Sequence, residues 1–272
     1  MGFRQCQSDA CLYIRQDGGD TIILVVYVDD LLVGCKDAAK ISDVLMTLRK
    51  SFDITDLGMV KYFLGQEVRR EDGCYSLRLT SYIEELVEKF GLAECNPCKT
   101  PMDPGYVRYE GSQPLSDITR YRSLVGALLY ISVNARPDIA ASVLFLGRRV
   151  SQPTINDWKA AKRVLRYLKG TKELKLKFGP GEGWSLRGYS DADWAGDHES
   201  RKSTTGFIFF YGMGPITWVS RRQSCVTLSS MEAEKAQQKF LKITKVALVS
   251  YELNVPPRDR NTSTQGNISS GI

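Results

Sequence analysis

Residues 22–33 read Ile22-Ile23-Leu24-Val25-Val26-Tyr27-Val28-Asp29-Asp30-Leu31-Leu32-Val33, an apolar stretch divided by two acids. The first run is rich in β-branched residues and a second apolar run follows the acids, so the pattern predicts a β-hairpin. Asp29 and Asp30 then lie at its apex, where stability alone would favour Asn-Gly or Asp-Gly and where like charges repel. A requirement other than folding therefore favours this pair of carboxylates.

Binding of a divalent metal is one such requirement. Two or more carboxylates can hold a pair of Mg²⁺ ions about 3.5 to 4 Å apart, so that one ion activates the attacking oxygen and the other stabilises the leaving oxygen. The alternative is an exposed acidic turn that binds nothing. Taken alone, a bare Asp-Asp pair favours that alternative.

Outward from the hairpin, the first half of the chain has an α+β pattern. We expect a helix over about 37–50, strands around 62–68 and 74–79, and a helix over about 82–90 that ends at Gly91. Between Cys95 and Pro114 the prolines and glycines are too dense for regular structure, which predicts a connector. The predicted domain boundary lies near residue 105.

The second half predicts an α/β unit. Helices are expected over 121–131, 138–150 and 154–168, with Pro137 and Pro153 near the starts of two of them. Strand patterns follow over 186–190, 206–211 and 216–220, and a further helix opens near Ser229.

The composition is that of a globular protein with one or two domains, since 43% of its 272 residues are hydrophobic. No apolar stretch reaches the roughly 18 to 20 residues that a membrane span requires, and the amino terminus has no secretory h-region. We therefore expect a soluble intracellular protein, cytoplasmic or nuclear, whose seven cysteines are free thiols. The net charge of +6 leans toward an anionic partner without deciding the function.

The sequence around Asp29 and Asp30 resembles that of a known family. Tyr27-Val28-Asp29-Asp30 resembles the polymerase signature of reverse transcriptases, and its flanks resemble the copia-like branch of retrotransposon Pol polyproteins. The matching segments are Phe3-Arg4-Gln5-Cys6-Gln7-Ser8-Asp9-Ala10-Cys11-Leu12-Tyr13-Ile14, Lys61-Tyr62-Phe63-Leu64-Gly65-Gln66-Glu67-Val68, Thr100-Pro101-Met102, Tyr121-Arg122-Ser123-Leu124-Val125-Gly126 and Ala135-Arg136-Pro137-Asp138-Ile139. The resemblance covers residues 1 to about 257.

The resemblance implies three regions. Residues 1–105 would be part of a reverse-transcriptase palm with a thumb-like region, 106–180 a helical connector, and 181–272 an incomplete ribonuclease H-like mixed sheet with helices. Asp29 and Asp30 would be the catalytic palm carboxylates and metal ligands, with Asp29 the more direct ligand. In the family an upstream aspartate completes this site, and the present chain begins after it. We therefore predict no polymerase activity from this chain alone.

A second set of acids lies in the last third of the chain. Gly188-Tyr189-Ser190-Asp191-Ala192-Asp193 puts an acid at the end of an expected strand, and Ser229-Ser230-Met231-Glu232-Ala233-Glu234 puts two at the start of an expected helix. Two-metal nucleases are built from acids in such places. Glu232 has another explanation, because Ser229 and Glu232 have the spacing of a capping box, whereas Glu234 has none.

These segments resemble the copia-like ribonuclease H. The resemblance makes Asp191 and Glu234 catalytic ligands for Mg²⁺ or Mn²⁺, with Asp193 as the alternative to Asp191. Lys235 stands where the family has tyrosine, and beyond Pro257 the expected strand with a further catalytic aspartate is missing. Losses of ligands that act as a unit are not additive, so we expect weak metal binding and a dead or nearly dead nuclease.

The helix expected over 154–168 has a basic face. It consists of Lys159, Lys162, Arg163, Arg166 and Lys169, opposite an apolar face of Trp158, Ala161, Leu165 and Leu168. Such a stripe suits phosphate contacts without sequence preference. The alternative is a solvated basic face, and the family resemblance favours nucleic-acid binding.

Two classes of function stay open. The first is an enzyme fragment whose parent copies RNA into DNA and degrades the RNA strand of the RNA:DNA hybrid, with the rest of the Pol polyprotein as its partner. The second is a non-catalytic nucleic-acid-binding remnant or domesticated protein. The missing carboxylates favour the second for this chain.

Overall fold

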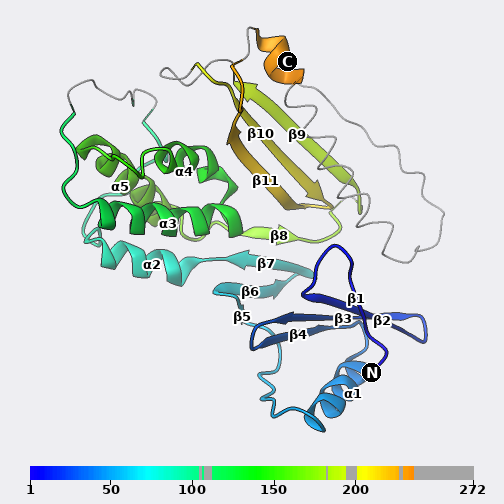
Figure 1. Ribbon diagram of the computed structural model, residues 1–272. Helices are drawn as coiled ribbons and strands as arrows, with labels where there is room; N and C mark the ends of the chain where they lie inside the picture. The colour runs from blue at the N-terminus through cyan, green and yellow to red at the C-terminus, as the bar shows by residue number, and fades with distance from the viewer. Residues whose placement is uncertain (104–105, 107–111, 182, 194–200, 227–228, 236–272) are drawn as a thin grey trace. The chain divides into compact units, whose positions relative to one another are not determined.

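The computed structural model describes residues 1–103, 106, 112–181, 183–193, 201–226 and 229–235, and it divides into two compact units (Figure 1). The first unit contains Met1–Phe63, and the second contains the described residues from Leu64 onward. Three antiparallel sheets and five α-helices are described, which confirms the mixed α and β character expected from the sequence. Among the described residues, no helix is both long enough and apolar enough to cross a membrane.

The first unit is a four-stranded antiparallel sheet followed by one helix. The strands lie in the order β1 (Arg4–Gln5), β2 (Leu12–Asp17), β3 (Asp20–Tyr27) and β4 (Asp30–Gly34), and the helix is α1 (Ala38–Arg49). Asp37 caps α1 by accepting a hydrogen bond from the Ala39 N–H at 2.8 Å. Ile22, Val44 and Leu48 form the buried centre of this unit. The predicted hairpin and the predicted helix over 37–50 are both confirmed.

The second unit begins beyond the short strand β5 (Tyr62–Phe63) and contains most of the helices. Its first strands are β6 (Gln66–Glu71), β7 (Cys74–Arg78) and β8 (Leu176–Phe178), which pair antiparallel in that order. Its helices are α2 (Thr80–Lys89), α3 (Ile118–Asn134), α4 (Ala140–Gly147) and α5 (Ile155–Gly170), with a 3-10 turn at Pro137–Ile139. Thr154 and Asp157 form a capping box at the start of α5.

The helices α2 to α5 share one apolar core. Its fully buried members include Ile83, Tyr121, Leu124, Leu128, Ile131, Leu146, Leu165 and Leu168. Because α2 packs in the same core as α3 to α5, these four helices belong to one compact unit. The compact units divide near residue 63, and the domain boundary near residue 105 stays a prediction.

The second unit also contains a three-stranded antiparallel sheet. Its strands β9 (Leu186–Asp193), β10 (Thr204–Tyr211) and β11 (Gly214–Arg222) lie in the order β11-β10-β9, close to the three predicted ranges. The Trp218 indole N–H on β11 donates to the Ser132 carbonyl on α3 at 2.7 Å, which fastens this sheet to the helices. A helical turn over residues 230–235 follows β11, where the sequence predicts a helix.

Two ion pairs join the elements of the second unit. Glu67 on β6 accepts hydrogen bonds from Arg78 Nε on β7 at 2.9 Å and from the Ser81 N–H at the start of α2 at 3.1 Å. After α3, Arg136 donates two hydrogen bonds to the Asp138 carboxylate, at 2.9 and 2.7 Å. A further hydrogen bond from Arg136 to the Thr171 carbonyl ties this turn to the end of α5.

Candidate functional site

The apex of the β3–β4 hairpin carries the first pair of acids. Tyr27 pairs with Asp30 across the hairpin, so Val28 and Asp29 are the two turn residues and Asp30 begins β4. Val28 has a φ of +53° and is 84% exposed. A β-branched residue in this region of backbone space costs about 1 to 3 kcal/mol, and such strain concentrates at functional sites.

The two-residue turn places Asp29 and Asp30 next to each other at the apex, and both residues are exposed. Among the described residues, no ion pair or hydrogen bond holds the side chain of Asp29 or of Asp30. Carboxylate oxygens in such a setting are the ligands that Mg²⁺ and Mn²⁺ prefer. No three His, Cys, Asp or Glu side chains in the described part of the chain lie close enough to hold a metal ion together. The chemistry of these carboxylate oxygens therefore fits a divalent metal, with Asp29 and Asp30 as the two candidate ligands in the described part of the chain.

The second pair of predicted ligands begins with Asp191 on β9. The strand continues for two residues beyond Asp191, so this acid lies within the strand and Asp193 ends it. Asp191 pairs with Gly206 and Asp193 pairs with Thr204 on β10, so both acids occupy the same face of the sheet. The Asp191 carboxylate accepts a hydrogen bond from the Ala192 N–H at 2.9 Å and is exposed.

Glu234 lies on the helical turn over residues 230–235 and is also exposed. Ser229 Oγ accepts a hydrogen bond from the Glu232 N–H at 3.2 Å, which is the cap that the sequence predicts. Ala233 is fully buried, and its carbonyl accepts a hydrogen bond from the Gln223 side chain at 2.9 Å. The same Gln223 amide donates to Thr205 Oγ1 on β10 at 2.9 Å.

Gln223 therefore anchors the helical turn to β10, a role that the sequence analysis missed. Thr205 pairs with Ala192, so its side chain lies on the face of the sheet opposite to Asp191. The turn that carries Glu234 is thus fastened to one face, and Asp191 belongs to the other. The structure gives no contact between these two carboxylates. The segment beyond residue 235, where the family's next strand is expected and the sequence analysis finds it missing, lies outside the described residues.

The basic face of α5 is largely engaged with the connector that precedes α3. Three of its five cations donate to that segment: Arg163 to Thr100 Oγ1 at 3.0 Å, Arg166 to the Asn96 carbonyl at 2.7 Å, and Lys169 to the carbonyls of Leu92, Ala93 and Cys95. Lys162 lies over the Trp158 ring, 5.5 Å from its centroid, and Lys159 is exposed. Arg163, Arg166 and Lys169 therefore have a structural role. Nucleic-acid binding by the basic face of α5 stays a prediction.

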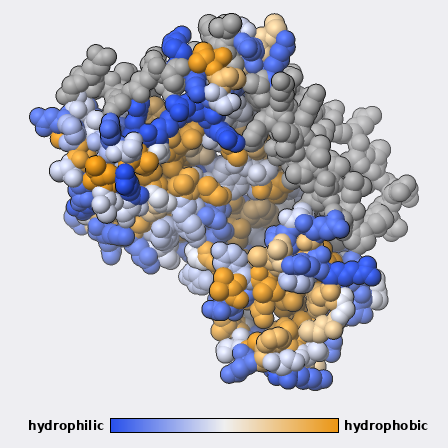
Figure 2. Space-filling model, viewed as in Figure 1, coloured by the Kyte–Doolittle hydropathy of each residue, from blue (hydrophilic) through white to orange (hydrophobic). Residues whose placement is uncertain are grey.

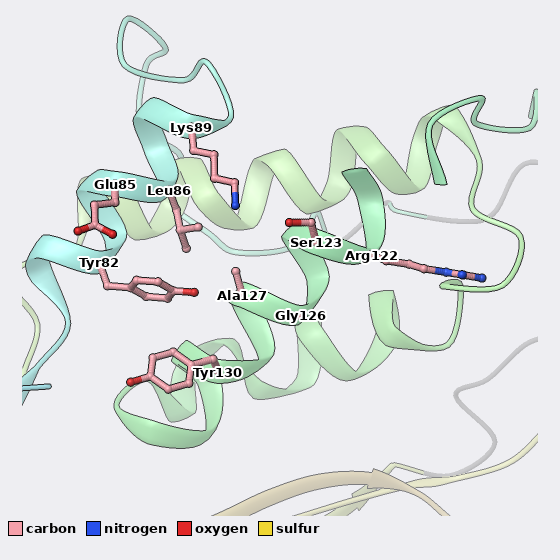
Figure 3. A pocket seen from close by; sticks show the side chains of 9 residues that line it. All are labelled: Tyr82, Glu85, Leu86, Lys89, Arg122, Ser123, Gly126, Ala127 and Tyr130. Carbon is pink, nitrogen blue, oxygen red and sulfur yellow. The ribbon is translucent and has the colours of Figure 1, made fainter. Parts of the chain in front are cut away.

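A hollow of about 420 Å³ lies between α2 and α3 (Figure 3). Tyr82 and Tyr130 flank one end with their rings edge to face, 5.2 Å apart between centroids. Figure 3 shows the Lys89 ammonium and the Ser123 hydroxyl directed toward the space, while Arg122 points away from it. Burial raises the pKa of both tyrosines above the ordinary value. The sequence did not predict this hollow, because its residues come from two helices separated by the connector.

Comparison with known proteins begins with a family model. Residues 1–104 match the model described as reverse transcriptase (RNA-dependent DNA polymerase). This range contains the strained hairpin with Asp29 and Asp30.

Whole-chain relatives extend the match beyond that range. The chain is 40% identical over 240 residues to the retrovirus-related Pol polyprotein from transposon TNT 1-94 of Nicotiana tabacum, covering 84% of this chain and 18% of the relative. It is 38% identical over 236 residues to the Pol polyprotein from transposon RE1 of Arabidopsis thaliana, covering 86% of this chain and 16% of the relative. The chain therefore spans less than a fifth of the length of these polyproteins.

A shorter relative matches over most of its own length. The uncharacterized mitochondrial protein AtMg00810 of Arabidopsis thaliana is 35% identical over 211 residues, which cover 78% of this chain and 88% of the relative. Together with the strained Tyr-Val-Asp-Asp apex, these matches show that the chain belongs to the family of retrovirus-related Pol polyproteins from copia-type transposons.

Proposed function

We propose that this chain joins the carboxyl-terminal part of a reverse-transcriptase palm and thumb to part of a ribonuclease H, and that it is catalytically incomplete on its own. Its parent polyprotein would perform RNA-directed DNA synthesis and hydrolyse RNA in RNA:DNA hybrids. The single observation that carries the proposal is the exposed carboxylate pair at the strained apex of β3 and β4, inside the region that matches the reverse-transcriptase model.

At the palm site, Asp29 and Asp30 would hold Mg²⁺ or Mn²⁺. Bound metal would supply positive charge to the phosphates of an incoming nucleotide. The hairpin would contribute geometry, because its two-residue turn keeps both carboxylates at one exposed point. Two carboxylates are fewer than the family site requires, so the other segments of the polyprotein would be needed to complete it.

Primer extension tests this part of the proposal. The purified chain, incubated with a primed RNA template, dNTPs and Mg²⁺, is expected to give no more extension than an Asp29→Asn/Asp30→Asn control. Extension by the wild-type chain that the control lacks would show a complete polymerase site and overturn the proposed incompleteness.

At the nuclease site, Asp191 and Glu234 would be the ligands that this chain contributes. Their placement supports an incomplete site, because the turn with Glu234 is fastened to the Thr205 face while Asp191 lies on the opposite face. A pair of carboxylates held apart binds metal less tightly than a full convergent set. We therefore expect little or no hydrolysis.

Hybrid cleavage tests this second site. A labelled RNA:DNA hybrid is incubated with the chain and Mg²⁺ or Mn²⁺, beside an Asp191→Asn variant. Equal, background-level cleavage by both proteins is the expected result. Cleavage that disappears in Asp191→Asn would show that the shortened site still works.

A second candidate function is a nucleic-acid-binding remnant without catalysis. It is favoured by the same incomplete carboxylate pairs, together with an overall charge of +6. Binding recorded on the cleavage samples tests this second candidate, since a remnant binds the hybrid without cutting it. Absence of binding would reject the remnant, whereas Asp191-dependent cleavage would reject the proposed incompleteness.

A further inference from the structure

The hollow between α2 and α3 has an open apolar side. Leu86, Gly126 and Ala127 form this side, and a Cβ atom added at Gly126 would meet no heavy atom within 4 Å. Figure 2 shows hydrophobic residues exposed over α3 next to hydrophilic residues over α2. The volume of about 420 Å³ lies within the range of small-molecule sites, roughly 300 to 1,000 Å³. The hollow is therefore large enough for a small ligand with an apolar part.

Hydrogen-bond donors from both helices point into this space. Figure 3 shows the Tyr82 hydroxyl and the Lys89 ammonium entering it from α2, and the Ser123 hydroxyl entering it from α3. None of these groups makes a hydrogen bond or an ion pair with another residue in the part of the chain that the structure describes. Lys89 Nζ lies 5.8 Å from the centroid of the Phe90 ring, a contact that leaves its N–H groups free to donate. One acceptor group in the hollow can therefore bind all of these donors.

The charges of the lining suit a ligand with one negative charge. Arg122 donates to the Val150 carbonyl at 2.7 Å and points away from the space, so Lys89 is the cation of the described lining that faces it. Glu85 lies one turn before Lys89 on α2 and also lines the hollow. Its carboxylate is directed away from the space, yet it lies near enough to repel further negative charge. The lining therefore suits a monoanion better than the many charges of a phosphodiester chain.

The tyrosine pair favours an apolar ring on that monoanion. The Tyr130 hydroxyl donates to the Leu64 carbonyl at 2.8 Å, which holds its ring beside Tyr82. Aromatic rings pack edge to face or offset, with centroids about 4.5 to 7 Å apart, so a third ring can join the pair. Burial raises the pKa of Tyr82 above its ordinary value, so its hydroxyl keeps the proton at neutral pH and remains a donor.

We propose that the hollow between α2 and α3 binds a small organic carboxylate with an apolar ring. A carboxylate accepts about four hydrogen bonds, so it can accept from the hydroxyls of Tyr82 and Ser123 and, with charge assistance, from Lys89. The ring packs over Gly126 beside the tyrosine pair. This site needs no metal and is independent of the carboxylate pairs proposed for catalysis.

The test measures ligand binding by ¹⁹F NMR on the full chain in EDTA. The probe is 3-(4-fluorophenyl)propionate, and its neutral amide, 3-(4-fluorophenyl)propionamide, carries the same ring without the charge. The expected Kd of the acid is on the order of 1 mM, as for a ligand of about 12 non-hydrogen atoms with ordinary affinity per atom. The amide is expected to bind at least about tenfold more weakly, because it lacks the charge-assisted hydrogen bond to Lys89.

Two pairs of variants test the charge and the space separately. Lys89→Gln should weaken binding of the acid about tenfold and leave binding of the amide unchanged. Its matched control is Lys177→Gln, which removes the same charge from an exposed lysine on β8 and should keep the wild-type Kd. Gly126→Leu should fill the open side and abolish binding of both ligands, whereas Gly126→Ala adds a single methyl group and should bind the acid within about threefold of wild type. Tryptophan fluorescence during urea unfolding verifies that each variant is folded.

Several outcomes would overturn the inference. Absence of acid binding by the wild-type chain, or equal Kd values for Lys89→Gln and Lys177→Gln, would show that the hollow is not a carboxylate site. Tighter binding of 4-fluorophenyl phosphate than of the acid would contradict a preference for one negative charge.

Competition identifies other occupants. Displacement of the acid by an acetylated and amidated Phe-Glu dipeptide at tenfold lower concentration would assign the hollow to an acidic protein segment instead of a free acid. Displacement by an RNA:DNA hybrid would assign it to nucleic acid, and either result would reject the small-molecule site. These measurements are made without metal, so they are unaffected by whether the proposed polymerase and nuclease sites are active.

Discussion

Replacing Glu67 by glutamine is expected to destabilise the second unit by about 2 to 4 kcal/mol. The Glu67 side chain is 8% exposed and its partner Arg78 is 14% exposed, so Glu67→Gln leaves a largely buried guanidinium without its carboxylate. Loss of one partner of a buried pair costs roughly 3 to 5 kcal/mol. Arg78 keeps a second carboxylate, Glu173 at 2.8 Å, and the glutamine oxygen can still accept from Ser81, which lowers the expected cost.

Tryptophan fluorescence during urea unfolding measures this cost. All four tryptophans lie between Trp158 and Trp218, so their signal follows the second unit and avoids a mixed transition of two units. The matched control is Glu173→Gln, which removes the other partner of Arg78. Glu173 is 68% exposed, so its loss should cost less than about 0.5 kcal/mol. Equal effects of the two substitutions would refute the argument from burial.

The same variant predicts a pH dependence. Burial raises the pKa of Glu67, but hydrogen bonds from Ser81 and Arg78 outweigh it, so the pKa lies below the ordinary value of 4.5. A carboxyl group with a depressed folded-state pKa stabilises the fold above its unfolded pKa, and this contribution disappears as the pH falls through the folded pKa. The difference in unfolding free energy between wild type and Glu67→Gln should therefore be full at pH 7 and shrink below about pH 4.5. A difference that grows on acidification would contradict the assignment.

Three further substitutions test other parts of the structure. Val28→Gly should stabilise the β3–β4 hairpin by about 1 kcal/mol, because relief of the positive φ outweighs the conformational entropy that glycine loses on folding. The expected sign is slower amide hydrogen exchange in the hairpin, and unchanged exchange would count against backbone strain at Val28. Asp138→Asn should lower the free energy of unfolding in urea by about 2 kcal/mol, less than at a fully buried ion pair, because Asp138 is 34% exposed. Unchanged stability would mean that Arg136 finds another partner. Gln223→Ala should lower the free energy of local opening of residues 229–235 by about 1 to 2 kcal/mol, measured as faster amide hydrogen exchange at Ala233. Unchanged exchange protection would show that burial of Ala233 alone holds the helical turn.

The regular elements near the two acid pairs were predictable from local sequence. The apolar alternation around Asp29 and Asp30 defines both strands of the hairpin, and Ser229 marks the helix start through its capping spacing. These signals depend on residues within a few positions of each other. The strain at Val28 was not predictable, because the turn residues of the hairpin depend on the register that the flanking strands adopt.

The basic face of α5 shows why side-chain roles were harder to predict than elements. Periodicity places Arg163, Arg166 and Lys169 on one face of the helix. It does not reveal that the segment over residues 92–103 crosses that face and supplies hydrogen-bond acceptors. The neighbours of Arg222 on β11 were equally hard to predict. Arg222 pairs with Thr204 through the β10–β11 register, and Arg148 at the end of α4 donates to the same Thr204, a combination that no local pattern encodes.

The separation of both acid pairs from the apolar cores makes the functional tests interpretable. Asp29, Asp30 and Asp191 are exposed, and the described structure gives none of them a partner in the cores of either unit. Exposed substitutions of this kind change stability by less than about 0.5 kcal/mol, so asparagine at Asp191 removes a proposed ligand without unfolding the chain. Any activity lost in that variant is therefore chemical in origin. The apolar core of α2 to α5 contains none of these acids, so the proposed incompleteness of the two sites would not disturb that core.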